Sequence, residues 1–136
     1  MIKQLRILVC GGHKFIDPQK VADYLVTFAP AFFDALWHKW TIVAVIEGGA
    51  TGADRGGRIW ATDHLKIEPL TFPADWDRYG NKAGPIRNRA MLLEGLPNVV
   101  FAFPGKNGTA NTIKQTNELI RDGADIVLRR IYGDFR

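Results

Sequence analysis

Five short apolar runs, separated by segments of helix length, limit the possible folds of this chain more than any other feature. They are rich in β-branched and aromatic residues and do not alternate with polar residues, which is typical of strands buried on both faces. Four are clear, at residues 5–10, 42–46, 98–103 and 125–128, and a weaker one covers residues 67–72. We therefore predict five strands.

Helical patterns lie between the runs. Asp17 is a suitable N-cap and Pro18 a suitable first helical residue, so we predict a helix from there to residue 40 with a break or kink at Pro30. Further helices are predicted at residues 54–64, 85–94 and 109–121, the last ending at Asp122-Gly123.

The alternation of strands and helices predicts a mainly parallel sheet covered by helices on both faces. We expect one Rossmann-like, doubly wound domain over residues 1–136, with strand order 3-2-1-4-5. Ligands of such sheets bind at the carboxyl ends of the strands, where the order reverses. Gly- or Pro-containing segments follow four strands, at residues 11–15, 47–52, 72–84 and 104–109. The sequence therefore predicts a pocket at this edge.

Composition adds weaker constraints. The net charge of +4 suits an anionic ligand or nucleic acid but equally a solvated basic surface. The single cysteine, Cys10, ends an apolar run, so we expect it to be a small buried residue in a reducing cytoplasm. No signal peptide or apolar run of about 20 residues occurs, and we expect no membrane partner.

The stretch EGGATGADRGG, residues 47–57, has five glycines in eleven positions and leads from a strand into a helix. Glycines admit a ligand close to the main chain, and a helix N-terminus attracts phosphate. Thr51 would cap the helix or bind an anion. Asp54 would repel phosphate, so we assign it to a ribose or a structural partner. A tight turn without a ligand is the alternative.

A second such element is PGKNGTANT, residues 104–112. Gly105 and Gly108 would let backbone amides point inward, Thr109 would cap the helix and touch phosphate, and Lys106 would add a cation. The alternative is an ordinary helix start with polar surface residues and no ligand.

The segment at residues 74–92 supplies larger side chains. Trp76 and Tyr79 would stack on a base or sugar, or else cover the edge of the core. Arg87 is a candidate clamp for phosphate or carboxylate, whereas Arg89 points elsewhere.

Several functions are disfavoured by the motifs. Neither G-x-G-x-x-G nor G-x-x-x-x-G-K-[ST] occurs, and without serine there is no Ser–His–Asp triad. The histidines at 13, 38 and 64 lack metal-ligand spacing, so we expect no metal and no cofactor.

Together, GGATGAD, AGPIRNRAML and PGKNGTANT resemble the SLOG superfamily of Rossmann-like domains, most closely its YspA-like (YpsA-related) branch of small bacterial and phage proteins. This resemblance implies a nucleotide pocket between the two Gly-rich loops and assembly into homo-oligomers. The aromatic segment at residues 31–40 would form the subunit interface or belong to the core. Relatives include the LOG phosphoribohydrolases and the single-strand DNA-binding protein DprA.

LOG enzymes resemble the chain in the turn at residues 104–109, but they carry a second glycine at the position of Lys106. Their catalytic glutamate falls at Thr112, and Arg87 matches their arginine. Glu47 and Asp54 are the nearest substitute carboxylates.

The leading hypothesis is therefore binding of a nucleotide-derived small molecule. Its alternatives are hydrolysis of an N-glycosidic or phosphate bond by Glu47, Asp54 and Arg87, and single-stranded nucleic-acid binding. The predicted ligand-binding residues are Gly11, Gly12, Lys14, Phe15, Gly48, Gly49, Thr51, Gly52, Asp54, Trp76, Tyr79, Gly84, Arg87, Asn88, Pro104, Gly105, Lys106, Gly108 and Thr109.

Overall fold

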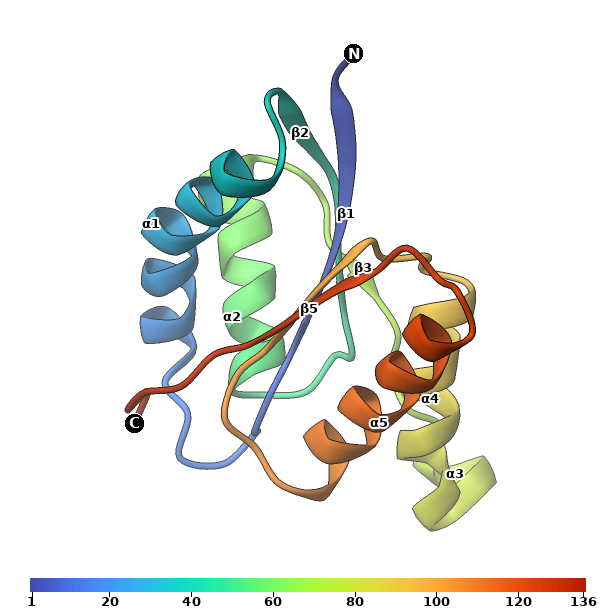
Figure 1. The fold of residues 1–136 in the computed structure, drawn as a ribbon. Helices are drawn as coiled ribbons and strands as arrows, with labels where there is room; N and C mark the ends of the chain where they lie inside the picture. Colours follow the sequence, from blue (N-terminus) through green and yellow to red (C-terminus); the bar gives the residue numbers. More distant parts are fainter.

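A computed structural model describes residues 1–136 as a five-stranded parallel sheet between two layers of helices (Figure 1). The strand order is β3-β2-β1-β4-β5, so the predicted Rossmann-like fold class and order 3-2-1-4-5 are confirmed. The strands are β1 (Lys3–Cys10), β2 (Trp40–Glu47), β3 (Leu70–Thr71), β4 (Val99–Ala102) and β5 (Val127–Arg130). The helices are α1 (Pro18–Leu36), α2 (Ala53–Ile59), α3 (Trp76–Tyr79), α4 (Ala83–Leu93) and α5 (Asn107–Arg121), with a π-helix at Trp60–Leu65 and a 3-10 helix at Gly80–Lys82.

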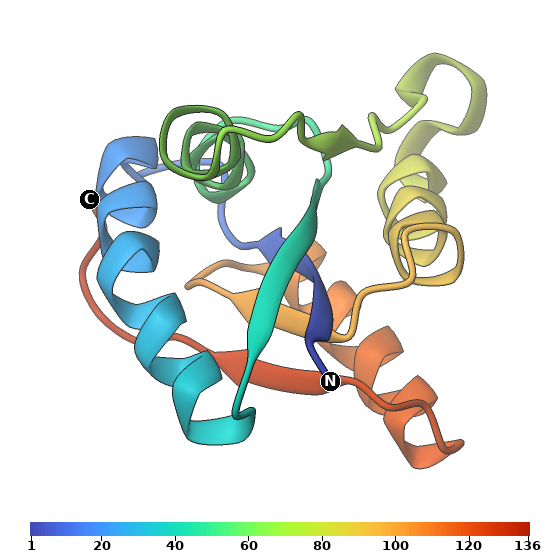
Figure 2. The same ribbon diagram turned by 90° about the horizontal axis from the view of Figure 1, so that it is seen from above.

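Both faces of the sheet are covered, which explains why the strand sequences do not alternate. Helices α1 and α2 lie on one face, and α4 and α5 lie on the other (Figures 1 and 2). Along β1, Ile7 and Val9 are buried in the cluster that includes residues of α1 and α2. Leu8 and Cys10 belong to the second cluster, together with Met91 of α4.

Helix α1 runs without a break through Pro30, so of the predicted break or kink the break is wrong. Aromatic packing on both sides of the proline fixes the helix against the sheet, because Phe28, Phe32 and Phe33 all contact Phe101 of β4. The helix ends at Leu36, earlier than predicted, and Trp40 already belongs to β2. Phe33 is completely buried, so at least this aromatic side chain belongs to the core.

Of the weaker strand predicted at residues 67–72, only Leu70–Thr71 is a strand, and it pairs only with Ile46 and Glu47. Pro69 precedes it and has no N–H to donate to a ladder. The predicted helix at residues 54–64 begins at Ala53 and widens into the π-helix from Trp60. Helix α3 and the 3-10 helix replace part of the predicted loop at residues 72–84. No helix is both long and apolar enough to cross a bilayer.

The segment after β5 returns to α1, and the chain end lies beside the start of that helix (Figures 1 and 2). Phe135 is buried and meets the rings of Tyr24 and Phe103 edge to face. The Asp17 N–H donates a 2.6 Å hydrogen bond to the carbonyl of Phe135. This segment therefore completes the core on the α1 side.

Gly56 lies where α2 packs on α1, and we expect Gly56→Ala to destabilise the fold. An added Cβ would lie 2.5 Å from the Cβ of Val21, and overpacking of this kind costs about 1–3 kcal/mol. That cost exceeds the gain in helix propensity, about 1 kcal/mol. Urea denaturation measures the difference. Gly108→Ala in α5, where no atom lies within 4 Å of the new Cβ, is the control and should not destabilise. An alanine at 56 that leaves the midpoint unchanged would contradict this packing.

Candidate functional site

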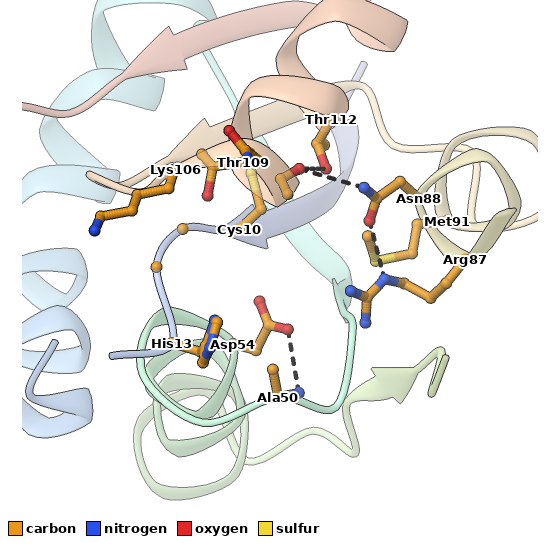
Figure 3. A pocket seen from close by; sticks show the side chains of 14 residues that line it. Cys10, His13, Ala50, Asp54, Arg87, Asn88, Met91, Lys106, Thr109 and Thr112 are labelled. Atoms are coloured by element: carbon orange, nitrogen blue, oxygen red, sulfur yellow. Dashed lines mark hydrogen bonds between the residues drawn. The ribbon is translucent and has the colours of Figure 1, made fainter. Parts of the chain in front are cut away.

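A cavity of about 280 Å³ opens at the carboxyl ends of the strands, between the β1, β2 and β4 loops and helix α4 (Figure 3). Its walls are mostly main chain and small side chains, with a few polar side chains among them. It is lined by Cys10, Gly11, Gly12, His13, Ala50, Asp54, Arg87, Asn88, Met91, Lys106, Asn107, Gly108, Thr109 and Thr112. The predicted pocket therefore exists as a cavity at the predicted sheet edge.

The peptide groups of Gly12 join three of these loops. Its N–H donates to the carbonyl of Pro104 at 2.8 Å, and its carbonyl accepts from the N–H of Ala53 at 3.0 Å. The Thr51 hydroxyl adds a bond to the carbonyl of His13 at 3.0 Å. Parallel strands place their carboxyl ends at one edge, and these bonds then fix the loops against one another.

Glycines are required where the loops come closest. Gly52 has φ +69°, and a Cβ there would lie 2.2 Å from the carbonyl oxygen of Gly12. A Cβ on Gly105 would lie 2.1 Å from Thr109 Oγ1 and 2.7 Å from the nitrogen of Gly12. These glycines, together with Pro104 and Gly49, shape the wall without lining it.

Glu47 is completely buried and does not line the cavity. Its carboxylate accepts hydrogen bonds from the Arg58 guanidinium, the Thr71 hydroxyl and, at 2.7 Å, the N–H of Gly49. Arg58 also donates to the carbonyl of Ala50 at 2.9 Å. This network holds the loop after β2 against α2 and β3, and we assign Glu47 a structural role in place of the catalytic one considered above.

Asp54 is the carboxylate that faces the cavity (Figure 3). It lies in the first turn of α2 and is only 7% exposed, and its Oδ2 accepts from the N–H of Ala50 at 3.2 Å. Burial outweighs that hydrogen bond and the nearby Arg87 charge, and it raises the pKa of Asp54 to about 6. This carboxyl group can therefore exchange a proton near neutral pH.

Arg87 enters the cavity from α4 and is half-buried (Figure 3). Its Nη1 donates to the carbonyl of Gly48, and its Nε donates to Asn88 Oδ1 at 2.9 Å. A Cβ on Gly48 would lie 2.3 Å from that Nη1, so glycine is needed for this contact. No carboxylate forms an ion pair with Arg87, although the Asp54 carboxylate lies near enough to interact with its charge.

The first turn of α5 forms the opposite wall. Asn88 connects it to α4, because its Nδ2 donates to Asn111 Oδ1 at 3.1 Å and to the carbonyl of Gly108 at 3.3 Å. The first N–H groups of a helix have no partner within the helix, and the positive end of its dipole lies there. Thr109 and Thr112 are buried beside this turn.

Eleven of the nineteen predicted ligand residues do not line the cavity. Five of them, Gly48, Gly49, Gly52, Pro104 and Gly105, belong to the loops that shape its wall, and the other six lie further away. Phe15 is 81% exposed and Trp76 is 57% exposed. Thr51 binds the neighbouring loop, and a Cβ on the buried Gly84 would contact the Trp76 ring at 3.4 Å. The six are Lys14, Phe15, Thr51, Trp76, Tyr79 and Gly84.

Other wall residues were not predicted: His13 and Ala50 come from the loops, and Asn107 is the first residue of α5. Met91 lies one helical turn after Arg87, and Thr112 lies three residues after Thr109. Extending each motif by one turn of its helix would have found both. Cys10, predicted as a buried structural residue, is 5% exposed and contributes to the cavity floor; burial raises its thiol pKa far above the usual range.

Comparison with known proteins identifies relatives of the chain. The model of the YAcAr family, described as the YspA, cpYpsA-related SLOG family, matches residues 5–79. Gene 61 protein of Mycobacterium phage D29 is 31% identical over 119 residues, which cover 83% of this chain and 89% of that protein. No solved structure matches the chain significantly. The matched range includes most of β1, all of β2 and helix α2, which carries Asp54.

We expect Asp54→Asn to stabilise the protein at neutral pH. The folded-state pKa of about 6 lies above the usual aspartate value of 3.8, so the contribution of Asp54 to stability is fully present below pH 4 and is lost as the pH rises through 6. Asparagine can keep the Ala50 bond without the charge. The gain in unfolding free energy should reach up to about 3 kcal/mol at pH 7.5 and vanish near pH 4.

Denaturant titrations at both pH values measure this gain, with the exposed Asp63 changed to Asn as the control. A loss of stability in Asp54→Asn at both pH values would show that the ionised carboxylate is favourable where it lies.

Proposed function

Because this chain belongs to the YspA, cpYpsA-related SLOG family, we propose that it binds a nucleotide or a nucleotide-derived molecule in the cavity between α2, α4 and α5. Family membership supports a nucleotide-related role in general. The more specific proposal depends on the charges and hydrogen-bonding groups in the cavity wall.

The observation that carries the proposal is Arg87. A half-buried guanidinium that forms no ion pair, and only interacts with Asp54 at longer range, leaves a positive charge in a partly desolvated place, which favours an anionic ligand. Its present acceptors, the Gly48 carbonyl and Asn88 Oδ1, are both neutral. A ligand phosphate would supply a negative charge and accept two parallel hydrogen bonds from the guanidinium.

The start of α5 supports the same assignment of the phosphate. Its free backbone amides and the Thr109 hydroxyl border the cavity opposite Asp54, with Lys106 at the edge. The Asp54 carboxylate would repel a phosphate beside it, so the proposed pose places a sugar hydroxyl there. The ligand then lies with its phosphate toward α5 and Arg87 and its sugar toward α2.

Arg87→Gln tests this pose directly. Loss of a charge-assisted contact should lower nucleotide affinity at least about tenfold, measured by isothermal titration with a panel of mononucleotides. Arg89→Gln is the matched control, since Arg89 lies two residues further along α4 but is exposed and outside the cavity. Failure of every nucleotide to bind at millimolar concentration, or equal losses in the two variants, would count against the proposal.

A second candidate function is hydrolysis of an N-glycosidic or phosphate bond in the bound nucleotide. The observation in its favour is the raised pKa of Asp54, about 6, in a cavity that also holds Arg87, because such a carboxyl group suits general acid–base catalysis near neutral pH. Thr112 offers no carboxylate at the position where LOG enzymes carry theirs.

Chromatography of nucleotides incubated with the protein tests this function. Turnover should be abolished in Asp54→Asn and persist in Asp63→Asn. If the unaltered protein binds nucleotides but returns all of them intact, the protein is a binding protein and the hydrolase is excluded for that panel.

A further inference from the structure

We propose that a second cavity, between α5 and β5, binds the second nucleoside unit of a phosphate-bridged ligand whose first unit occupies the main cavity. This inference rests on the proposed function and extends it from a mononucleotide to a dinucleotide.

The second cavity has a volume of about 200 Å³ and opens beside the first turn of α5. One wall is the turn after β4, with Phe103 and Gly105, and another is the side of α5 that carries Ala110 and Ile113. The third wall is the end of β5 and the segment after it, which includes Arg130 and Tyr132. Six of its eleven lining residues are hydrophobic, compared with three of fourteen in the main cavity.

The charged groups of this cavity are cations alone. Lys106 and Arg130 line it, and no acidic side chain does. Neither cation forms an ion pair, whereas Arg121 pairs with Asp122 and Arg136 with Asp134. Two unneutralised cations at one hollow favour a bound anion such as a phosphate.

The two cavities share a wall made of the turn that starts α5. Lys106 and Thr109 line both cavities. Figure 3 shows the Lys106 side chain pointing away from Arg87 and from the centre of the main cavity. Gly105 keeps this wall thin, because Thr109 Oγ1 and the Gly12 nitrogen leave no room for a side chain there. A phosphate bridge over this turn would leave one nucleoside on each side.

The outer edge of the second cavity carries an exposed aromatic ring. Tyr132 is 76% exposed, and the Arg130 guanidinium lies 5.9 Å from its ring centroid. Aromatic rings beside arginine are the usual platforms on which bases stack, and stacking tolerates different bases. The neighbouring Arg129 instead lies over Phe28 and Phe32, on the opposite side of β5. It therefore provides a matched control.

The test compares ligands of increasing length by isothermal titration. The probes are adenosine monophosphate, the 5′-phosphorylated dinucleotide pApA and the corresponding hexanucleotide, with the cytidine, guanosine and uridine series beside them. In the unaltered protein the dinucleotide should bind about tenfold more tightly than the mononucleotide, because its second unit binds as part of the same molecule.

Variants assign that gain to the second cavity. Arg130→Gln and Tyr132→Ala should each remove most of the gain and leave mononucleotide affinity unchanged. Tyr132→Phe, which keeps the ring, should retain the gain, and Arg129→Gln should behave as the unaltered protein. Thermal unfolding of each variant establishes that it is folded.

Three outcomes overturn the inference in distinguishable ways. If mononucleotides bind and dinucleotides bind no more tightly, the second cavity is not a nucleoside site while the proposed function stands. If no nucleotide of any length binds, the proposed function fails and this inference fails with it. A further large rise in affinity from di- to hexanucleotide, lost on raising the salt concentration, would replace the two-unit ligand by single-stranded nucleic acid.

Discussion

The site depends on hydrogen bonds of two adjoining peptide groups, those that carry the nitrogen and the carbonyl of Gly12. Because the first bonds to the loop after β4 and the second to the start of α2, the three loops at the strand ends form one body. Gly52 and Gly105 allow the close approach that these bonds require. Loops fixed in this way lose little further conformational freedom when a ligand binds, which favours affinity.

The elements that follow from local patterns could be predicted from the sequence. The strand order and the pocket at the strand ends were predictable because buried parallel strands and their Gly-rich loops have strong local signals. Arg87 was singled out by its place on a helix face. The break predicted at Pro30 does not occur, because the proline rule describes an isolated helix and leaves out tertiary contacts such as those of Phe28, Phe32 and Phe33 with Phe101.

Which carboxylate of EGGATGADRGG faces the cavity could not be read from the motif. The Glu47 carboxylate is held away from the cavity by hydrogen bonds from Arg58 on α2 and Thr71 on β3, which are distant in sequence. Asp54 accepts a single backbone hydrogen bond and remains in the cavity wall. The same limit applies to Trp76 and Tyr79. Their ring chemistry suited a base, but the short helix α3 carries them outside the cavity.

Asp54 also has a consequence for attempts to improve the protein. At neutral pH its charge is held in a poorly solvated place, so the folded chain is less stable than a neutral residue would make it. Directed evolution for heat resistance alone would therefore favour its replacement. Such a selection would remove the sole carboxylate from the cavity wall while leaving every strand and helix in place. A thermostable descendant should be checked for its ligand before it is used as a substitute for the natural chain.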